Sequence, residues 1–164
     1  MPSSEDFIDK DLKYCAHNYH PIPVVISKAK GVWVYDPEGR KYLDCLSAYS
    51  SQNTGHCHPE IIKALKEQAE VVTLTSRAFH NDMMGLYLKK LCEIVGPHIN
   101  DPYNSGIMAL PMNTGTEAVS TGLKVTRAWG YIKKKIPKNE AHILVCNNNF
   151  HGRTITIISF STEA

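Results

Sequence analysis

The stretch of sequence that decides the fold is MNTGTEA, residues 112–118. A short apolar segment, 107–112, leads into it, and a long helical pattern follows from Gly115 to about Lys134. Thr114 and Glu117 have the spacing of a capping box, in which each side chain accepts the backbone N–H of the other residue at a helix N-terminus. The stretch therefore predicts a turn that leads from a buried strand into a long helix.

The sequence after this helix returns to a strand pattern. Pro137 ends the helix, and residues 142–146 are again apolar and rich in β-branched residues. A strand, a helix and a second strand in this order require parallel strands joined by a right-handed crossover. We therefore expect an α/β fold, and propensity alone also favours a strand at 154–159.

The start of the predicted helix is a candidate anion site. Gly115 and Thr116 take its first positions, where backbone N–H groups have no partner within the helix. The helix dipole adds positive potential at the same point, so a phosphate group could bind there. The alternative is an ordinary helix cap without a ligand.

A second candidate segment, NNNFHGRT at residues 147–154, directly follows the strand predicted at 142–146. Ligands of open α/β sheets bind outside the carboxyl ends of the strands. There Phe150 could supply a stacking face, Gly152 a close backbone approach and Arg153 a fork for a carboxylate. The alternative is a core phenylalanine, a turn glycine and a solvated arginine. Because both segments would lie at one edge of the sheet, we expect them to face one pocket.

The sequence before residue 100 predicts a small antiparallel sheet and several helices. The sheet comprises segments 24–27, 32–35 and 40–46, with turn residues DPEG at 36–39. Three segments have a helical pattern. The first is capped by Ser3 or Ser4 and ends near Tyr14. The second starts at Pro59, and the third starts near Asn81 and ends at Gly96-Pro97.

Composition excludes several classes of protein. The 164 residues are 43% hydrophobic and 21% charged with a net charge of +2, which is typical of one folded domain and not of a disordered chain. Charges are spread along the chain, which argues against a nucleic-acid or membrane surface. No apolar run approaches the roughly 20 residues of a spanning helix. The acidic N-terminus predicts neither a secretory signal nor a mitochondrial presequence.

Cysteine, histidine and tyrosine give weaker signals. The five cysteines include no C-x-x-C pair and are expected to be reduced thiols of the cytosol. The spacing of His56-Cys57-His58 is too tight for a metal site and has no partner cluster, so we expect a structural loop and no metal. Tyr19 and Tyr49 lie in polar loop sequence, where their hydroxyls could be functional; packing at a rim or in a core is the alternative.

Several of these segments resemble one protein family. The chain is similar, from about Tyr14 to its last residue, to the N-terminal part of the ornithine aminotransferases, which are class III (fold type I) pyridoxal-phosphate aminotransferases. The segments that carry the resemblance are AHNYHP at 16–21, LSAYS at 46–50, GHCHP at 55–59, LTSRAF at 74–79, PMNTG at 111–115 and NF-x-GRT at 149–154. The resemblance implies a small antiparallel segment of the small domain, residues 1–54, followed by an incomplete cofactor-binding large domain, residues 55–164. It also implies a helix start at 154–159 in place of a strand, and an insertion at 98–106.

The resemblance implies pyridoxal 5′-phosphate as the cofactor. Gly115 and Thr116 would hold the cofactor phosphate through their backbone N–H groups, and Phe150 would stack on the pyridine ring. The Schiff-base lysine of the family has no counterpart up to Ala164, so the resemblance assigns no catalytic residue to this chain and implies that these residues alone are inactive.

The resemblance also implies a substrate pocket. Arg153 would bind a substrate carboxylate, and Tyr19 and Tyr49 would line the pocket, with Tyr19 at the end that holds the α-amino and α-carboxylate groups of ornithine. His151 takes a wall position that is Trp in the animal enzymes. The implied reaction transfers the δ-amino group of L-ornithine to 2-oxoglutarate, giving glutamate 5-semialdehyde and glutamate.

The implied enzyme is a homodimer of the cytoplasm, with the mitochondrial matrix as the alternative location. Two other readings stay open. One is a related ω-aminotransferase that acts on acetylornithine or 4-aminobutyrate. The other is a truncated, non-catalytic chain.

Overall fold

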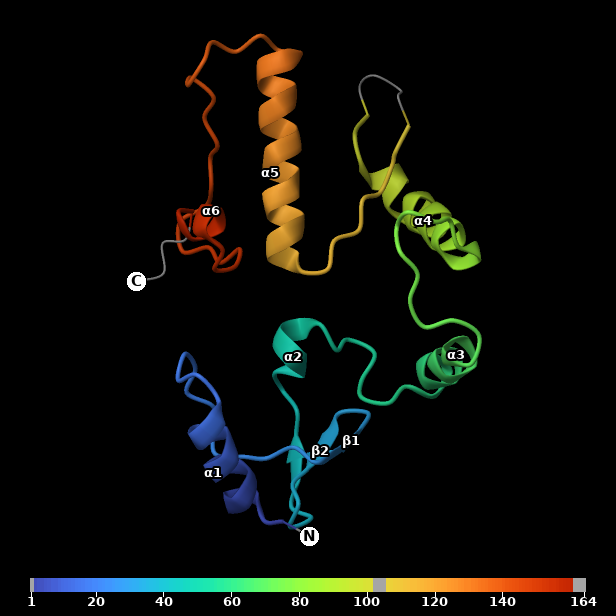
Figure 1. Ribbon diagram of the computed structural model, residues 1–164, viewed down its shortest axis with the longest axis vertical. Coiled ribbons are helices and arrows are strands. Elements are labelled where there is room, and N and C mark those ends of the chain that lie inside the picture. Colours follow the sequence, from blue (N-terminus) through green and yellow to red (C-terminus); the bar gives the residue numbers. More distant parts are fainter. Residues whose placement is uncertain (1, 102–105, 161–164) are drawn as a thin grey trace. The chain divides into compact units, whose positions relative to one another are not determined.

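The computed structural model describes residues 2–101 and 106–160 and divides into two units, 1–79 and 80–164 (Figure 1). The domain boundary expected at residue 54 stays a prediction. The first unit contains α1 (Ser4–Tyr14), β1 (Lys28–Lys30), β2 (Trp33–Tyr35), β3 (Lys41–Leu43), the short element α2 (Ser47–Ser50) and α3 (Pro59–Ala69). The second contains α4 (Asp82–Val95), the 3₁₀ turn η1 (Gly96–His98), α5 (Gly115–Ile132) and α6 (Ile155–Ile158).

Helix α1 begins with the cap that its sequence predicts. The Ser3 side chain accepts the Asp6 N–H at 3.2 Å, and the Asp6 carboxylate accepts the Ser3 N–H at 2.7 Å, which completes a capping box. The helix ends at Tyr14, and the backbone becomes extended at Cys15. The predicted first helix is therefore confirmed, both in its cap and in its length.

The three strands form an antiparallel sheet in the order β1-β2-β3 (Figure 1). Val34 on β2 is 4% exposed and lies opposite Ala29 on β1 and Tyr42 on β3. The first strand was expected at 24–27 and instead lies at 28–30. The two-residue connection between β1 and β2, with Gly31 in a positive-φ conformation, sets this register and leaves 24–27 outside the ladder.

The turn between β2 and β3 carries a buried carboxylate. Asp36, 3% exposed, accepts the Arg40 N–H at 2.8 Å, the Arg40 Nε–H at 2.5 Å and the Tyr42 hydroxyl at 2.8 Å. Burial raises the pKa of Asp36, but the hydrogen bonds from Tyr42 and Arg40 outweigh burial and leave that pKa below its ordinary value. In the same turn, Glu38 accepts the N–H and the hydroxyl of Ser4 at 2.7 and 2.6 Å, which ties α1 to the hairpin.

We expect Asp36→Asn to accelerate amide hydrogen exchange in β2 and β3, because an amide cannot pair with the Arg40 guanidinium as a carboxylate does. The pKa of Asp36 is lower in the folded state than in the unfolded state. Its contribution is therefore present above about pH 4 and is lost as the pH falls through the folded-state pKa. Mass spectrometry of peptides covering 33–43, corrected for intrinsic exchange rates, measures this effect. Asp9→Asn on the exposed side of α1 is the control, and equal exchange in the two variants would contradict the prediction.

The second unit is organised around helix α5. Asn81 caps α4 by accepting the N–H groups of Met83 and Met84 at 3.1 and 2.7 Å. Helix α6 lies beside the N-terminal end of α5 (Figure 1). The helix start that the family resemblance implies at 154–159 is thus confirmed, and the strand favoured by propensity there is wrong. Residues 102–105 of the expected insertion lie outside the described residues, and the Gly106 N–H donates to Asp101 across them at 2.8 Å.

The two strands expected on either side of α5 are not hydrogen-bonded strands. Residues 107–112 and 142–146 pair with no strand within 2–101 and 106–160. A buried parallel strand is stabilised by ladders to neighbouring strands, and neither segment has one here. The overall class, a small antiparallel sheet followed by helices of an α/β fold, is retained.

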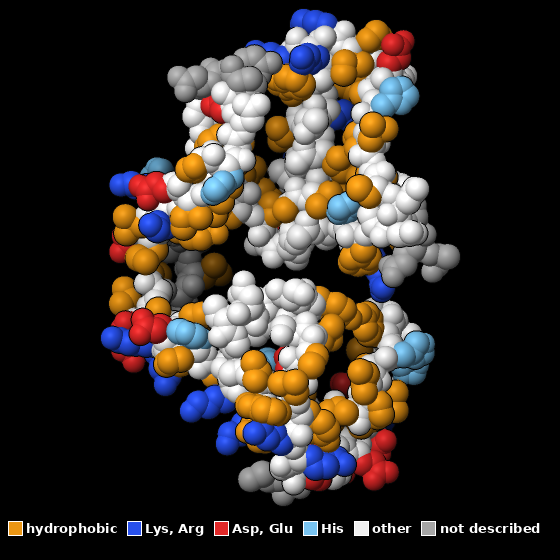
Figure 2. All heavy atoms as spheres, turned by 180° about the vertical axis from the view of Figure 1, so that it is seen from behind, with side chains coloured by type: hydrophobic (Ala, Val, Ile, Leu, Met, Phe, Trp, Pro, Cys, Tyr) orange, Lys and Arg blue, Asp and Glu red, His pale blue; other side chains and the backbone are white. Residues whose placement is uncertain are grey.

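Few side chains are buried. Val34 and Ile157 are the buried hydrophobic residues of the described ranges, and hydrophobic side chains reach the surface over much of the face in Figure 2. Within the same residues, no helix combines the length and the apolar character that crossing a bilayer requires.

Candidate cofactor and substrate site

The N-terminus of α5 has the geometry that its sequence predicts. The Thr114 hydroxyl accepts the Glu117 N–H at 3.2 Å, and the Glu117 carboxylate accepts the Thr114 N–H at 2.9 Å. The N–H groups of Gly115 and Thr116 belong to the first turn and have no partner within the helix. A Cβ built on Gly115 would meet no atom within 4 Å apart from the adjoining residues and the helix's own backbone, so no other segment packs against Gly115 on that side.

The loop 147–154 packs directly on this helix start. Gly152 has φ +116°, and a Cβ there would lie 2.5 Å from Cβ and Oγ1 of Thr116. The hydroxyl oxygens of Thr116 and Thr154 are 3.3 Å apart. The structure therefore brings the two predicted segments together, and glycine at 152 is what allows the contact.

Phe150 and Arg153 lie on this loop as a pair. The Phe150 ring is 58% exposed, and the Arg153 guanidinium carbon lies 5.8 Å from the ring centroid, within the range of a cation–π contact. His151 between them is exposed. An accessible aromatic face and a guanidinium fork thus lie on the same loop whose residues Gly152 and Thr154 contact Thr116 in the first turn of α5.

Asn149 is a site residue that sequence reasoning missed. Its side-chain amide donates to the carbonyl oxygens of Cys146 and Phe160, at 2.9 Å in the second case, and so closes the loop against the end of α6. Its Oδ1 is buried without a hydrogen-bond partner among the described residues. Asn148 before it has φ +55°, a conformation that asparagine tolerates better than most residues. The run of three asparagines was the available signal for an anchored turn.

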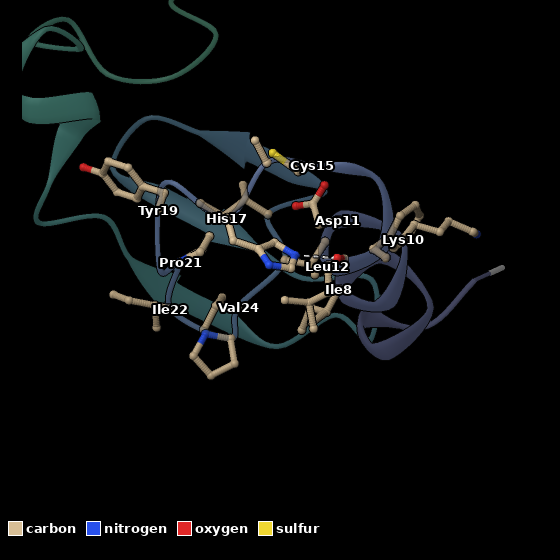
Figure 3. Close-up of a pocket in the computed structure, with 15 residues that line it drawn as sticks. Ile8, Lys10, Asp11, Leu12, Cys15, His17, Tyr19, Pro21, Ile22 and Val24 are labelled. Carbon is tan, nitrogen blue, oxygen red and sulfur yellow. Dashed lines mark hydrogen bonds between the residues drawn. The ribbon is translucent and has the colours of Figure 1, made fainter. Parts of the chain in front are cut away.

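The two tyrosines predicted to be functional meet in the first unit. The Tyr19 and Tyr49 hydroxyls share a short hydrogen bond although 30 residues separate them. Tyr19 lies at one end of a cavity of about 620 Å³ between α1 and residues 15–26, and its hydroxyl points away from the side chains of α1 (Figure 3). The cavity is lined mainly by apolar side chains, and Tyr49 is not among its lining residues.

Tyr49 lies on a strained turn. The four residues of α2 all have positive φ, from 49° to 65°, and none of them is glycine. A left-handed conformation costs about 1–2 kcal/mol for each such residue. Asp44 holds the start of the turn, because one carboxylate oxygen accepts the Leu46 and Ser47 N–H groups at 3.0 and 2.8 Å. Together with His56, these bonds hold the pKa of Asp44 below its ordinary value, the Ser47 N–H having the largest effect.

His56 binds the other oxygen of the same carboxylate. Its Nε2 lies 2.8 Å from Asp44 Oδ2, and since a carboxylate only accepts, Nε2 is the donor. The His56 backbone is fixed in turn by two hydrogen bonds of 2.8 Å with Gly31. Across residues 2–101 and 106–160, no group of three or more His, Cys, Asp or Glu side chains could hold a metal ion.

Comparison with known proteins identifies the family. The model of the family "Aminotransferase class-III" matches residues 14–164. The chain belongs to the class-III aminotransferases. This class-III chain is 57% identical over 162 residues to the ornithine aminotransferase of Brevibacillus brevis, and 56% identical over 161 residues to that of Saccharomyces cerevisiae. These alignments cover 99% and 98% of the chain but only 38% and 36% of the two relatives, so the chain spans little more than a third of their length.

Solved structures agree with this assignment. The structure of the ornithine aminotransferase of Toxoplasma gondii aligns with a TM-score of 0.89 and 46% identity. The alignment covers 98% of this chain and 36% of the Toxoplasma gondii chain. The acetylornithine aminotransferase of Elizabethkingia anophelis matches 91% of this chain and 37% of its own, with a TM-score of 0.80 and 48% identity. The chain therefore has the fold of an N-terminal part of fold type I aminotransferases.

Proposed function

We propose that the chain supplies the N-terminal part of an ornithine δ-aminotransferase. The observation that carries the proposal is the packing of loop 147–154 on the start of α5, which brings the segment with Phe150 and Arg153 against the first turn of that helix. Sequence identity of more than half to curated ornithine aminotransferases supports the choice among class-III enzymes.

The residues present fit pyridoxal 5′-phosphate. The N–H groups of Gly115 and Thr116, at the positive end of an 18-residue helix, would bind its phosphate. The exposed face of Phe150 would stack on its pyridine ring. The Toxoplasma gondii relative holds this cofactor at its active site. When bound, the cofactor supplies an electron sink for amine transfer, and the protein supplies binding and orientation.

Each unit of this chain contributes a candidate substrate-binding group. The Arg153 guanidinium can bind a substrate carboxylate with two parallel hydrogen bonds, while its contact with Phe150 fixes its position beside the cofactor ring. The paired hydroxyls of Tyr19 and Tyr49 would receive the α-amino and α-carboxylate end of L-ornithine. Holding the α end leaves the δ-amine as the group that reaches the reaction centre. His151 would form part of the pocket wall.

We further propose that 2-oxoglutarate accepts the amino group and that the enzyme works as a homodimer in the cytoplasm. The same Arg153 can bind a carboxylate of either substrate, because both substrates carry one. The dimer is supported by the exposed hydrophobic side chains of both units, which a second copy could cover in part (Figure 2).

We expect the protein, expressed at its natural length, to prefer L-ornithine as the amino donor. The value of kcat/KM should exceed those for acetylornithine and 4-aminobutyrate by about 10²-fold or more, because a site built to bond the free α-amino group rejects analogues that lack it. Initial rates with 2-oxoglutarate measure this for all three amines. Acetylornithine is the sharper competitor, given the 48% identity to the Elizabethkingia anophelis enzyme. Equal use of the three amines would contradict the proposal.

A further inference from the structure

A chain of contacts runs from the sheet to the hydroxyl of Tyr49. It starts at Gly31, whose backbone exchanges two hydrogen bonds of 2.8 Å with the His56 backbone. It continues through the His56 ring to Asp44 and from Asp44 to the Leu46 and Ser47 N–H groups. These hydrogen bonds end at Leu46 and Ser47, and the backbone of the turn continues from there to Tyr49; all of these residues lie within the first unit.

The first link of this chain is built tightly. Gly55 has φ +77°, and a Cβ there would lie 3.2 Å from the Gly31 backbone. His56 follows directly, and its side chain is only 25% exposed, as the Asp44 side chain is 14% exposed. The imidazole therefore reaches Asp44 from a fixed backbone and with little exposure to solvent, which makes the geometry of this hydrogen bond well defined.

The hydrogen bonds from Asp44 to the start of the turn explain how Tyr49 is held in its position. Four consecutive non-glycine residues in the left-handed region do not hold that conformation by themselves. The Asp44 carboxylate accepts the N–H groups at the entry of the turn, and the Tyr19 hydroxyl meets the Tyr49 hydroxyl at its far side. Strain of this kind persists only where the surrounding contacts determine it.

We propose that Asp44 and His56 are positioning residues that hold the left-handed turn 47–50, place the Tyr49 hydroxyl against Tyr19, and so set the selectivity for the α end of the amino donor. The part of the proposal that concerns substrate selectivity rests on the proposed function. The part that concerns the position of Tyr49 is independent of it. Neither residue touches the reacting atoms. Their effect should therefore reach the amino-donor half of the reaction and spare the half in which 2-oxoglutarate reacts.

The first test separates the two half-reactions of the protein at its natural length. His56→Ala should lower kcat/KM for L-ornithine by up to about 10²-fold, the scale of a misplaced positioning group, and leave kcat/KM for 2-oxoglutarate at the wild-type value. His56→Gln, whose amide nitrogen can reach the place of Nε2, should restore most of the loss. Asp6→Asn is the matched control, because Asp6 also accepts a backbone N–H, at 2.7 Å, but in the α1 cap. Equal losses for both substrates, or no loss, would overturn the proposal.

The second test needs no activity. The ¹⁹F resonance of 3-fluorotyrosine at position 19, assigned with Tyr19→Phe, should shift in Tyr49→Phe and shift in the same direction in His56→Ala, while His56→Gln should keep the wild-type position. If His56→Ala does not fold, Asp44→Asn takes its place in both tests. If the chemical shift of the Tyr19 resonance is the same in wild type, His56→Ala and Asp44→Asn, the proposal is wrong. Failure of the wild-type protein to use L-ornithine, with these shifts present, refutes the proposed function and leaves the placement of Tyr49 supported.

Discussion

Replacing Gly152 by alanine is expected to weaken pyridoxal 5′-phosphate binding by roughly 10- to 100-fold. The new Cβ would lie 2.5 Å from Thr116, and φ at this position is +116°. Inserting a methyl group into such a contact costs about 1–3 kcal/mol. The loop can relieve it only by moving away from α5, and Phe150 and Arg153 move with it. A spectroscopic titration of the protein at its natural length with the cofactor measures the change in Kd.

Two further variants locate the cause of that loss. Gly122→Ala, in the middle of α5 with no atom within 4 Å, should leave the Kd unchanged and stabilise the helix by about 0.5–1 kcal/mol. Thr116→Gly in the Gly152→Ala background removes the clashing atoms and keeps the Thr116 N–H, so part of the affinity should return. A Kd that is equal in wild type and Gly152→Ala would show that the loop does not form the cofactor site.

The elements predicted well from sequence are those that local interactions determine. The capping boxes at Ser3 and Thr114 and the Asn81 cap each satisfy N–H groups within three residues, so their sequence is enough. The hairpin turn at 36–39 is equally local, with the Gly39 N–H donating to Asp36 at 3.0 Å. Segments 107–112 and 142–146 were wrong as strands because a strand needs partners that local sequence does not supply.

The candidate site divides in the same way. The helix start at Gly115 and Thr116 could be predicted because its capping box is local in sequence, and the anion site there stays a prediction. Asp44 and His56 could not, because no propensity predicts four non-glycine residues in a left-handed turn. Their roles depend on a hydrogen bond between residues 12 apart and on a bridge from Gly31 to His56. Both contacts depend on the tertiary structure and therefore cannot be predicted from local sequence.

In the site that we propose, the cofactor-binding and substrate-binding side chains of loop 147–154 would have different chemical requirements. Phe150 must present a ring, which any planar aromatic side chain could do in part. Arg153 must present a planar fork of fixed direction, which no other side chain has. The Arg153 position is therefore the more sensitive of the two to a conservative exchange, and it gives the sharpest test of how the substrate is held.

We expect Arg153→Lys to reduce kcat/KM for L-ornithine and for 2-oxoglutarate by roughly 30-fold or more. Truncating a hydrogen-bonded charge pair costs about 2–5 kcal/mol, and an ammonium keeps the charge but cannot form two parallel bonds to one carboxylate. The cofactor Kd should change little, because we assign the cofactor phosphate to the N-terminus of α5 and not to Arg153. Steady-state rates with each substrate varied, combined with the cofactor titration, measure both quantities.

Arg127→Lys is the matched control for this exchange. The Arg127 guanidinium carbon lies 5.1 Å from the Tyr131 ring on α5, so it has the same kind of aromatic contact as Arg153 without a place in the proposed site. If the stacking contact alone mattered, the two lysine variants would behave alike. Because we assign Arg153 to a carboxylate, only Arg153→Lys should lose activity, and the loss should appear with both substrates. A loss confined to one of them would assign the guanidinium to that substrate alone, and no loss at all would remove Arg153 from the site.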